Sequence, residues 1–457
     1  MIYNHFLVHR SIQYLFMSAH ITALLDALGS GPANAGYLCE RLGISQPTLS
    51  RRIAAASDRV LRIGKAKAAQ YLARRSVAGQ AQLALYRVTA AGRLEQWGEL
   101  LPVHPGFVVR EAGQPDRHFE GLPWWLQDMR PQGFLGRHWA RQRAAGLGLP
   151  DDPRNWTDDH VLVALAAGQH DVTGNLLLGD LSRDAWLAQR PEGIAAGERA
   201  QRFPELAARS MAGERIGSSA GGEQPKFAVQ VDGRDVLVKF SAAQDSAISQ
   251  RWRDLLLAEH LALRHLAGHG LPAAQSELLD AGGQRFLQVA RFDRTEQGGR
   301  RGVVSLDALD AEFVGCGSSA WPAVTDALFA QGVITQQAHH DAGRLYAFGR
   351  LIGNTDMHFG NLAFLHDGAL PFPLTPTYDM LPMGLRPHDS GAMRDDLDPL
   401  TPPAQPPVAV WHEMLPLARA YWQRLAGHPL ASAGFAAIAG RQQAWLDDVG
   451  QQLERLA

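Results

Sequence analysis

The spacing of hydrophobic and polar positions divides the chain into a small N-terminal module and a larger body. In the module, apolar residues recur at helical spacing over 21–28 and 35–42, and a third helix is expected to begin at Ser45. A glycine follows each of the first two helices, as is common where helices end. Segments 60–67 and 70–75 have the pattern of two short strands. Three helices and a two-stranded wing in this order predict a winged helix-turn-helix.

The body combines strands with helices. Polar and apolar residues alternate over 235–240, which indicates a strand, and a helical apolar pattern follows over 255–261. Residues 286–294 have the pattern of a buried strand that leads into a polar segment. Further on, an apolar helical run over 345–352 and a short apolar run over 362–365 enclose a polar loop. This mixture predicts an α+β fold.

Composition narrows the class of protein. The chain has 457 residues, of which 46% are hydrophobic, and this length suggests two to three domains. No run approaches the roughly 18 uninterrupted apolar residues of a membrane helix, and the N-terminus lacks the layout of a signal peptide. Only Cys39 and Cys316 are present, too few for a disulfide framework or a thiolate metal site. We therefore expect a cytoplasmic protein without a membrane partner and without a structural metal.

The overall charge of −2 conceals an asymmetry between the module and the body. Residues 41–75 contain nine basic side chains and one acid, which gives +8 and leaves −10 for the rest of the chain. In the third predicted helix, Leu49 and Ile53 share one face, so the polar and basic side chains are free to enter a groove of DNA. A merely solvated, charged face is the alternative. The expected DNA-binding residues are Gln46, Thr48, Ser50, Arg51, Arg52, Arg62, Lys65 and Lys67.

The polar loop after residue 352 carries the strongest indication of chemistry. Asp356 and Asn361 have the D-x-x-x-x-N spacing of the protein-kinase catalytic loop, where the Asp accepts the proton of the attacking hydroxyl and the Asn binds magnesium. Asp379 follows an apparent hairpin, at the position of the D-F-G aspartate. Asp and Asn are common in loops, so the spacing alone is weak evidence. The helix before the loop and the strand after it strengthen the prediction of phosphoryl transfer.

Three segments upstream suit a nucleotide site. The Gly/Ser-rich loop 217–223 runs into a strand, and its glycines would let backbone N–H groups approach phosphates. Lys239 near the end of a strand and Glu259 in the next helix match the kinase pair that grips phosphates. Phe292 lies where a strand leads into a possible hinge between lobes, whose main-chain groups would pair with adenine. Taken singly, each feature is more often a surface turn, an edge lysine or a core phenylalanine.

Together these motifs resemble the HipA family of serine/threonine kinase toxins from bacterial type II toxin–antitoxin systems. The resemblance rests on residues 218–226, 290–294, 353–361 and 378–380, and it covers most of residues 80–430. The N-terminal module is similar to that of the YjjJ-type branch, in which a DNA-binding module lies on the toxin chain. The implied α+β organisation is a winged helix-turn-helix over 1–78, a HipA-like N-terminal subdomain and kinase N-lobe over 79–290, and a mainly helical C-lobe over 291–457.

The resemblance implies roles for individual residues in the body. Asp356 would be the catalytic base, with His358 supporting its loop, and Asn361 and Asp379 would bind Mg²⁺. The residues implied in binding ATP are Lys239, Lys226, Glu259 and Phe292.

The implied activity is phosphorylation of a protein hydroxyl with ATP and Mg²⁺, and components of the translation machinery are a known substrate class of the family. A serine of the Gly/Ser loop can be autophosphorylated in the family, which silences the kinase, and Ser218 or Ser219 is the counterpart here. The winged helix would bind double-stranded DNA in cis. One chain does not reveal whether a separate antitoxin exists.

Two other functions fit part of the pattern. A catalytically silent kinase fold would leave a DNA-binding transcriptional regulator that senses nucleotide, although the intact Asp356, Asn361 and Asp379 argue against loss of activity. The same groups with a metal could instead cut DNA, because acid and metal chemistry also serves nucleases. A nuclease has no need for Lys239 or Glu259, which ranks it below the kinase.

Overall fold

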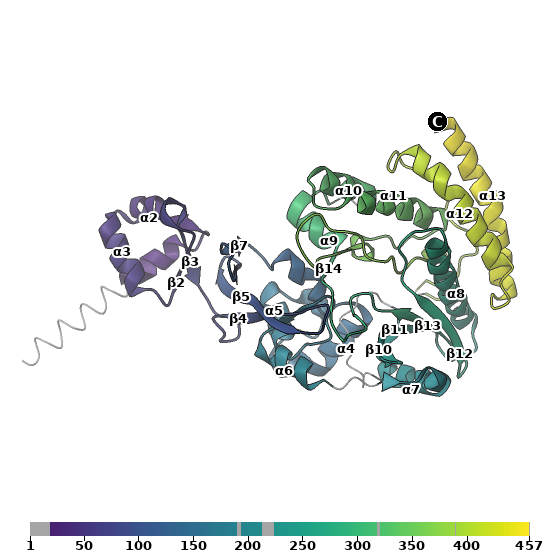
Figure 1. Ribbon diagram of the computed structural model, residues 1–457, viewed down its shortest axis with the longest axis horizontal. Helices are drawn as coiled ribbons and strands as arrows, with labels where there is room; N and C mark the ends of the chain where they lie inside the picture. The colour runs from purple at the N-terminus through teal and green to yellow at the C-terminus, as the bar shows by residue number, and fades with distance from the viewer. Residues whose placement is uncertain (1–18, 190–192, 213–223, 318–319, 389, 457) are drawn as a thin grey trace, which may run out of the picture.

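The computed structural model describes residues 19–189, 193–212, 224–317, 320–388 and 390–456. The N-terminal module lies at one end of the long axis, a sheet-rich middle part follows, and the larger body lies at the other end with its C-terminal helices outermost (Figure 1). Helices and strands are mixed throughout, which confirms the expected mixed fold. None of the helices in the described residues combines the length and the apolar character needed to cross a membrane.

The N-terminal module consists of short helices and a small sheet. Residues 19–27 are helical, and the side chain of Asn34 accepts a hydrogen bond from the backbone N–H of Tyr37 at the start of α2. Gly43 ends α2 with a left-handed φ of 62°, a conformation that glycine adopts without strain. The core is made of apolar side chains from the helix 19–27, from α2 and α3 and from the strands, whereas η1 contributes none. The elements are β1 (Ala33–Asn34), α2 (Ala35–Leu42), α3 (Gln46–Ala55), β2 (Val60–Ile63), η1 (Ala66–Ala68) and β3 (Gln70–Arg74).

The module is joined to the middle part by backbone pairing. Strand β3 pairs with β2 on one side and with β5 on the other, where Ala73 lies opposite His104. The Arg75 guanidinium donates to the carbonyl of Val103 at 2.7 Å and to the carboxylate of Asp159 at 2.6 Å. One eight-stranded sheet therefore runs across residue 78. The strands of the middle part are β4 (Leu83–Val88), β5 (Leu94–His104), β6 (Phe107–Glu111), β7 (Arg117–Phe119) and β8 (Leu176–Leu178).

The helices of the middle part pack against the body. Trp124 meets the rings of Phe313 and Phe372 at centroid distances of 5.5 and 6.3 Å. Apolar residues of both parts consequently belong to one continuous core. These helices are η2 (Trp124–Met129), α4 (Gly133–Arg143), η3 (Ala145–Leu147), η4 (Pro153–Asn155), α5 (Asp158–Ala166) and α6 (Asp180–Ala188).

The body begins with a five-stranded sheet in the order β12-β13-β11-β10-β9. One face packs on α7 through Phe203, which contacts Phe227 and Phe286. The other face packs on α8 through Leu256 and Leu287. The elements are β9 (Gly193–Ile194), η5 (Ala196–Glu198), α7 (Arg199–Met211), β10 (Lys226–Val231), β11 (Arg234–Phe240), α8 (Ala247–Gly268), β12 (Ser276–Ala281) and β13 (Gln284–Ala290).

The rest of the body is mainly helical. Strand β15 pairs with β14, and only a single bridge, Phe364 to Leu374, joins it to the segment that follows. The hairpin expected before Asp379 is thus reduced to one bridge, because Pro371 and Pro373 have no N–H for a ladder. The elements are β14 (Val303–Ser305), α9 (Leu306–Leu309), the π-helical turn η6 (Asp310–Val314), α10 (Trp321–Ala330), α11 (Gln336–Leu351), η7 (Phe359–Asn361), β15 (Ala363–Leu365), η8 (Met383–Leu385), α12 (Val408–Ala426) and α13 (Ala433–Leu456).

Candidate active site

A buried lysine joins the sheet, helix α8 and the segment after β15. Lys239 on β11 donates to both carboxylate oxygens of Glu259 on α8, at 2.6 and 2.8 Å, and also bonds Asp379. Lys239 is 5% exposed and Glu259 is fully buried. Burial by itself would lower the pKa of Lys239, but the carboxylates of Asp379 and Glu259 raise it above its ordinary value, so the ammonium stays charged.

A second lysine faces the same group of charges. Lys226 on β10 lies directly opposite Lys239 in the antiparallel register, so both side chains emerge on the α8 face of the sheet. Burial would raise the pKa of Asp379, but the positive charges of Lys239 and Lys226 outweigh it and hold the pKa below its ordinary value. Asp379 is therefore an ionised carboxylate. Its φ of 52° is left-handed, which is uncommon outside glycine and marks a constrained position.

Asn354 connects this ion group to the catalytic-loop motif. Its amide nitrogen donates to the carbonyl of Asp379 at 3.3 Å, and its amide oxygen accepts the backbone N–H of Asp356 at 3.0 Å. Asn354 is 4% exposed. We did not single it out from the sequence, although it lies in the motif 353–361. Its role depends on bringing two segments together, and local spacing does not reveal that.

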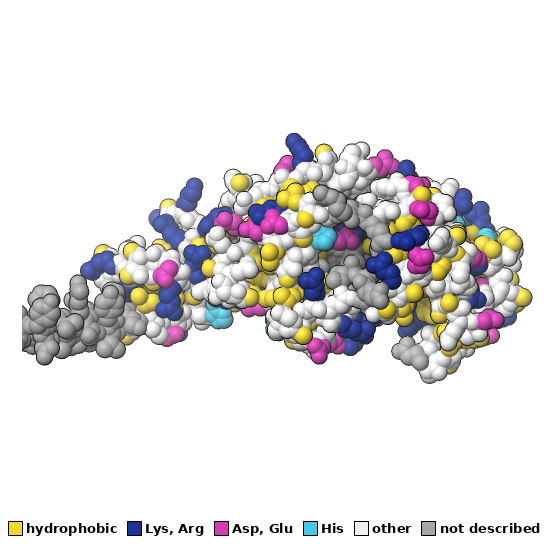
Figure 2. Space-filling model, turned by 90° about the horizontal axis from the view of Figure 1, so that it is seen from below, with side chains coloured by type: hydrophobic (Ala, Val, Ile, Leu, Met, Phe, Trp, Pro, Cys, Tyr) yellow, Lys and Arg dark blue, Asp and Glu magenta, His cyan; other side chains and the backbone are white. Residues whose placement is uncertain are grey.

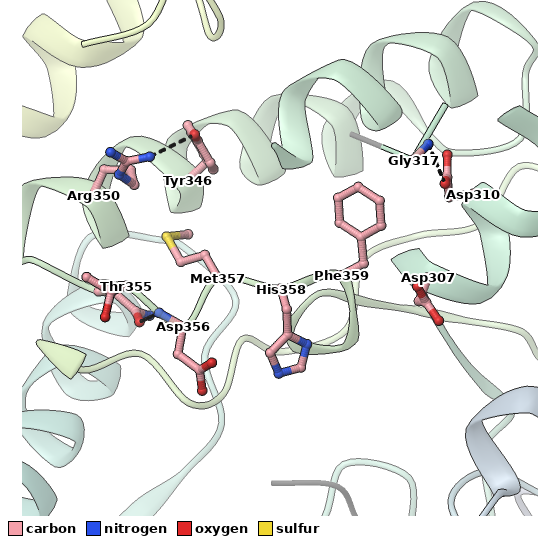
Figure 3. Close-up of a pocket in the computed structure, with 11 residues that line it drawn as sticks. Asp307, Asp310, Gly317, Tyr346, Arg350, Thr355, Asp356, Met357, His358 and Phe359 are labelled. Carbon is pink, nitrogen blue, oxygen red and sulfur yellow. Dashed lines mark hydrogen bonds between the residues drawn. The ribbon is translucent and has the colours of Figure 1, made fainter. Parts of the chain in front are cut away.

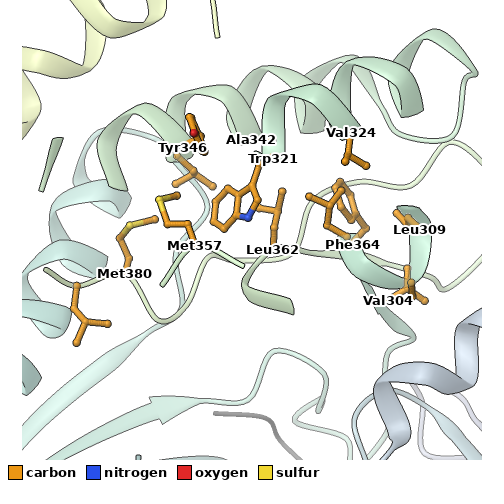
Figure 4. Packing of buried hydrophobic residues seen from close by; sticks show 14 of the residues in the cluster. Val304, Leu309, Trp321, Val324, Ala342, Tyr346, Met357, Leu362, Phe364 and Met380 are labelled. Carbon is orange, nitrogen blue, oxygen red and sulfur yellow. The ribbon is translucent and has the colours of Figure 1, made fainter. Parts of the chain in front are cut away.

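The loop presents alternate side chains to opposite sides. Met357 is buried against Met380 and helix α11, in the packing shown in Figure 4. The neighbours Asp356 and His358 are exposed and extend away from that core (Figure 3). His358 accepts the N–H of Gly360 at 3.0 Å through its Nδ1 atom. The carboxylate of Asp356 has no hydrogen-bond or ion-pair partner among the described residues, so it is free to accept a proton.

Asn361 and Asp379 fit the oxygen donors that Mg²⁺ prefers. The Asn361 amide nitrogen donates to the carbonyl of Asp356 at 2.7 Å, which leaves the amide oxygen for a ligand. The side chain of Asp379 is 25% exposed and ionised. Within the described residues, no three His, Cys, Asp or Glu side chains form a metal cluster. The phosphates of a nucleotide and water would have to complete the coordination, as is usual for Mg²⁺.

A cluster of arginine–aspartate ion pairs holds the segment after β13 against the middle part. Asp293 accepts from Arg291 at 2.9 Å, from Arg294 at 2.7 Å and from the backbone N–H of Gly174 at 3.2 Å. Asp171 of the middle part bonds the same two arginines at 2.6 and 2.8 Å. The sequence did not disclose this cluster, since Asp171 lies about 120 residues before the two arginines.

Phe292 lies within the segment that these ion pairs hold in place. Its ring stacks on Tyr378 with centroids 5.7 Å apart, beside Asp379. The N–H groups of Ala290 and Arg291 already donate to the carbonyls of Gln275 and Asp235, at 2.8 and 3.0 Å. The next N–H, that of Phe292, has no partner among the described residues and would be available to a nucleotide base.

The predicted DNA-binding residues lie on the N-terminal module, on α3, on β2 and in the turn between β2 and β3. Gln46, Ser50 and Arg51 are exposed on α3, whereas Thr48 and Arg52 are partly buried. Ser218 and Ser219 lie outside the described residues. The other predicted DNA-binding side chains, Arg62, Lys65 and Lys67, are all exposed.

Comparison with known proteins identifies the family of the chain. Residues 79–187 match the YjjJ-like toxin middle domain, and residues 218–399 match the HipA-like C-terminal domain. These matches define the chain as a HipA-like toxin. Toxin YjjJ of Escherichia coli (strain K12) is 39% identical over 444 residues, which cover 95% of this chain and 100% of that protein. The chain belongs to the YjjJ-like toxin family, and the resemblance found in its motifs is confirmed.

Two solved structures are also similar. A HipA of Shewanella oneidensis MR-1, solved with HipB and its operator DNA, has a TM-score of 0.47 and 16% identity, and the match covers 81% of this chain and 97% of that one. The proinflammatory kinase CtkA of Helicobacter pylori has a TM-score of 0.36 and 13% identity, with 51% and 93% covered.

Proposed function

We propose that the chain is a serine/threonine protein kinase that uses ATP and Mg²⁺ to phosphorylate a protein hydroxyl. The observation that carries the proposal is the contact of Lys239 with both Glu259 and Asp379, next to a loop that presents an unpaired Asp356. Phosphoryl transfer depends on positioning of the reacting groups and on stabilisation of the charge of the phosphates. A lysine held by two carboxylates, two metal ligands and a base supply these.

Each residue has a separate task in this proposal. Lys239, held by Glu259 and assisted by Lys226, contacts the phosphates, and the Phe292 N–H pairs with adenine. Asn361 and Asp379 hold Mg²⁺, which would neutralise charge on the transferred phosphoryl group. Asp356 accepts the proton of the substrate hydroxyl. His358 holds the loop through the N–H of Gly360.

The decisive test is transfer of the γ-phosphate of ATP to protein, with and without Mg²⁺, followed by mapping of labelled serines. We expect label that depends on Mg²⁺ and that includes Ser218 or Ser219. Binding of ATP without any transfer would favour the nucleotide-sensing regulator. Cleavage of DNA without ATP would favour the nuclease.

Replacing Lys239 should weaken nucleotide binding. Lys239→Met removes a charged donor, and such hydrogen bonds contribute about 1.5–3 kcal/mol, so we expect a loss of affinity for ATP of roughly tenfold to a hundredfold. Isothermal titration calorimetry with MgATP measures it. Lys67→Met, on the exposed turn of the module, is the control and should leave the affinity unchanged. Equal affinity in the Lys239 variant would remove this residue from the nucleotide site.

For the N-terminal module, we extend the proposal to a winged helix-turn-helix that binds double-stranded DNA. The helices α2 and α3 and the hairpin β2–β3 occur in the order of that motif. Lys and Arg side chains gather on the narrow end of the molecule that the module forms (Figure 2). Because the chain belongs to a toxin family, a separate antitoxin is a further proposed partner. The choice of translation components as substrates rests on the HipA resemblance alone.

Binding of DNA by the module should depend strongly on salt. A phosphate contact releases counterions, so Arg51→Ala and Arg62→Ala should each weaken binding and reduce the slope of log affinity against log salt concentration by about 1. Fluorescence anisotropy of the full chain with a labelled duplex, over a series of salt concentrations, measures this. Arg234→Ala, on an exposed arginine of the five-stranded sheet, is the control. Affinity that does not change with salt would exclude phosphate contacts.

A further inference from the structure

A cavity of about 680 Å³ opens beside Asp356. Its walls come from the catalytic loop, from α11 and from the α9–η6 segment (Figure 3). Of the groups in the proposed catalytic site, Asp356 and His358 line this cavity, whereas Lys239 and Asp379 do not. A segment bound in the cavity would therefore reach the catalytic carboxylate without occupying the place of the phosphates.

The two ends of the cavity have opposite charge. Asp307 and Asp310 lie at one end and Arg350 at the other, with Asp356 between them (Figure 3). Asp310 is buried, and its carboxylate accepts the N–H groups of Cys316 and Gly317 at 3.2 and 3.4 Å, so it is held in place. Asp307 is exposed, and its carboxylate has no hydrogen-bond or ion-pair partner in the part of the chain that the structure describes.

The cationic end also lacks a counter-ion. Arg350 donates to the hydroxyl of Tyr346 at 3.3 Å, and its guanidinium lies 5.9 Å from the centre of the same ring. It pairs with no carboxylate among the described residues. The neutral tyrosine orients the guanidinium and leaves its charge unbalanced. Tyr346, Met357 and Phe359 supply an apolar surface between the charged ends.

We propose that this cavity selects the protein substrate by charge, taking an extended segment in which a basic side chain and an acidic side chain flank the acceptor hydroxyl. The basic side chain would pair with Asp307, and the acidic one with Arg350. The hydroxyl between them would face Asp356. This inference rests on the proposed kinase function, because it assigns the cavity to the acceptor of that reaction.

The test uses the full-length protein and three short synthetic peptides that each contain one serine. One peptide has Arg before and Glu after the serine, the second has the reverse order, and the third has no charged side chain. Binding is measured by fluorescence anisotropy without ATP, and phosphorylation is measured separately with MgATP. We expect one of the two charged peptides to bind about tenfold more tightly than the uncharged one, since each partly exposed ion pair contributes modestly.

Reversing the charges at both ends of the cavity should reverse the preference of the protein between the two charged peptides. Asp307→Lys combined with Arg350→Glu is expected to prefer the peptide that the unmodified protein rejects, and to bind ATP unchanged. Asp448→Lys, on an exposed part of α13 outside the cavity, is the matched control and should keep the original preference. Equal binding of the three peptides, or a preference that survives the double reversal, would overturn the inference. Selective binding without any phosphate transfer would support charge selection and contradict the kinase proposal, so the two failures are distinguishable.

Discussion

Replacing Asp356 by alanine is expected to lower the rate of phosphate transfer by about 10² to 10⁴-fold, the usual contribution of a positioned general base. Asp356 is exposed and its carboxylate has no partner among the described residues, so its removal leaves no buried charge behind. The contact that fixes the loop uses the backbone N–H of Asp356, at 3.0 Å from the Asn354 amide oxygen, and alanine retains that N–H. Stability and ATP affinity should therefore stay near those of the unmodified protein.

The measurement is single-turnover transfer from labelled ATP, together with thermal unfolding and calorimetry of each variant. Asp448→Ala removes another exposed carboxylate, from α13, and serves as the control for the change of net charge. An Asp356→Ala protein that binds ATP and transfers phosphate at the unmodified rate would show that another group takes the proton. In that case the assignment of Asp356 as the base would be wrong, and the roles assigned to the other site residues would not be affected.

Replacing Asp293 by alanine is expected to destabilise the protein by about 3–5 kcal/mol, the usual consequence of removing one partner from a buried ion pair. The Asp293 side chain is 9% exposed, and the two arginines that it binds are equally buried, at 9% and 7%. Without Asp293, Asp171 is the one counter-ion that these arginines keep among the described residues, and the N–H of Gly174 loses its acceptor. The loss would affect both the segment that carries Phe292 and its attachment to the middle part.

Urea unfolding of the full chain measures the change. Asp447→Ala is the matched control, because it breaks an ion pair near the surface, in which the Asp447 side chain is 55% exposed and that of Arg419 34%. Exposed pairs contribute about 1 kcal/mol or less, so this variant should unfold almost as the unmodified protein does. A similar small effect for Asp293→Ala would mean that the cluster does not stabilise the fold.

Lowering the pH should remove part of the same stability that Asp293→Ala removes, because it protonates the Asp293 carboxylate. Burial would raise the pKa of Asp293, but Arg291 and Arg294 lower it to about 2, below the ordinary value of 3.8. A carboxyl whose pKa is lower in the folded state stabilises the protein above its unfolded pKa, and this contribution disappears as pH falls through the folded pKa. The unmodified protein should thus lose this stability between about pH 4 and pH 2, and Asp293→Ala should lack that portion of the acid dependence.

The secondary structure followed closely from local sequence. The helix Ala35–Leu42 and its end at Gly43 have the predicted bounds, as a cap and a left-handed glycine are properties of a few adjacent residues. The strand with Lys239 and the helix with Glu259 were also recognised from local periodicity. The pairing of β15 with β14 was not predicted, because it joins segments that are distant in the chain. The hairpin expected after β15 is reduced to one bridge, since Pro371 and Pro373 have no N–H for a ladder.

By itself, the sequence determined which residue types are present at the spacing of a kinase loop, the basic character of the N-terminal module, and the periodicity of most elements. These are local properties, since a turn of helix or a stretch of strand involves residues within a few positions of each other. Only the tertiary structure decided that Asn354 links Asp379 to Asp356, that Asp171 and Asp293 hold the same arginines, and that a cavity with two charged ends opens at the loop. Each of these depends on side chains far apart in sequence, whose meeting is set by the packing of the shared core.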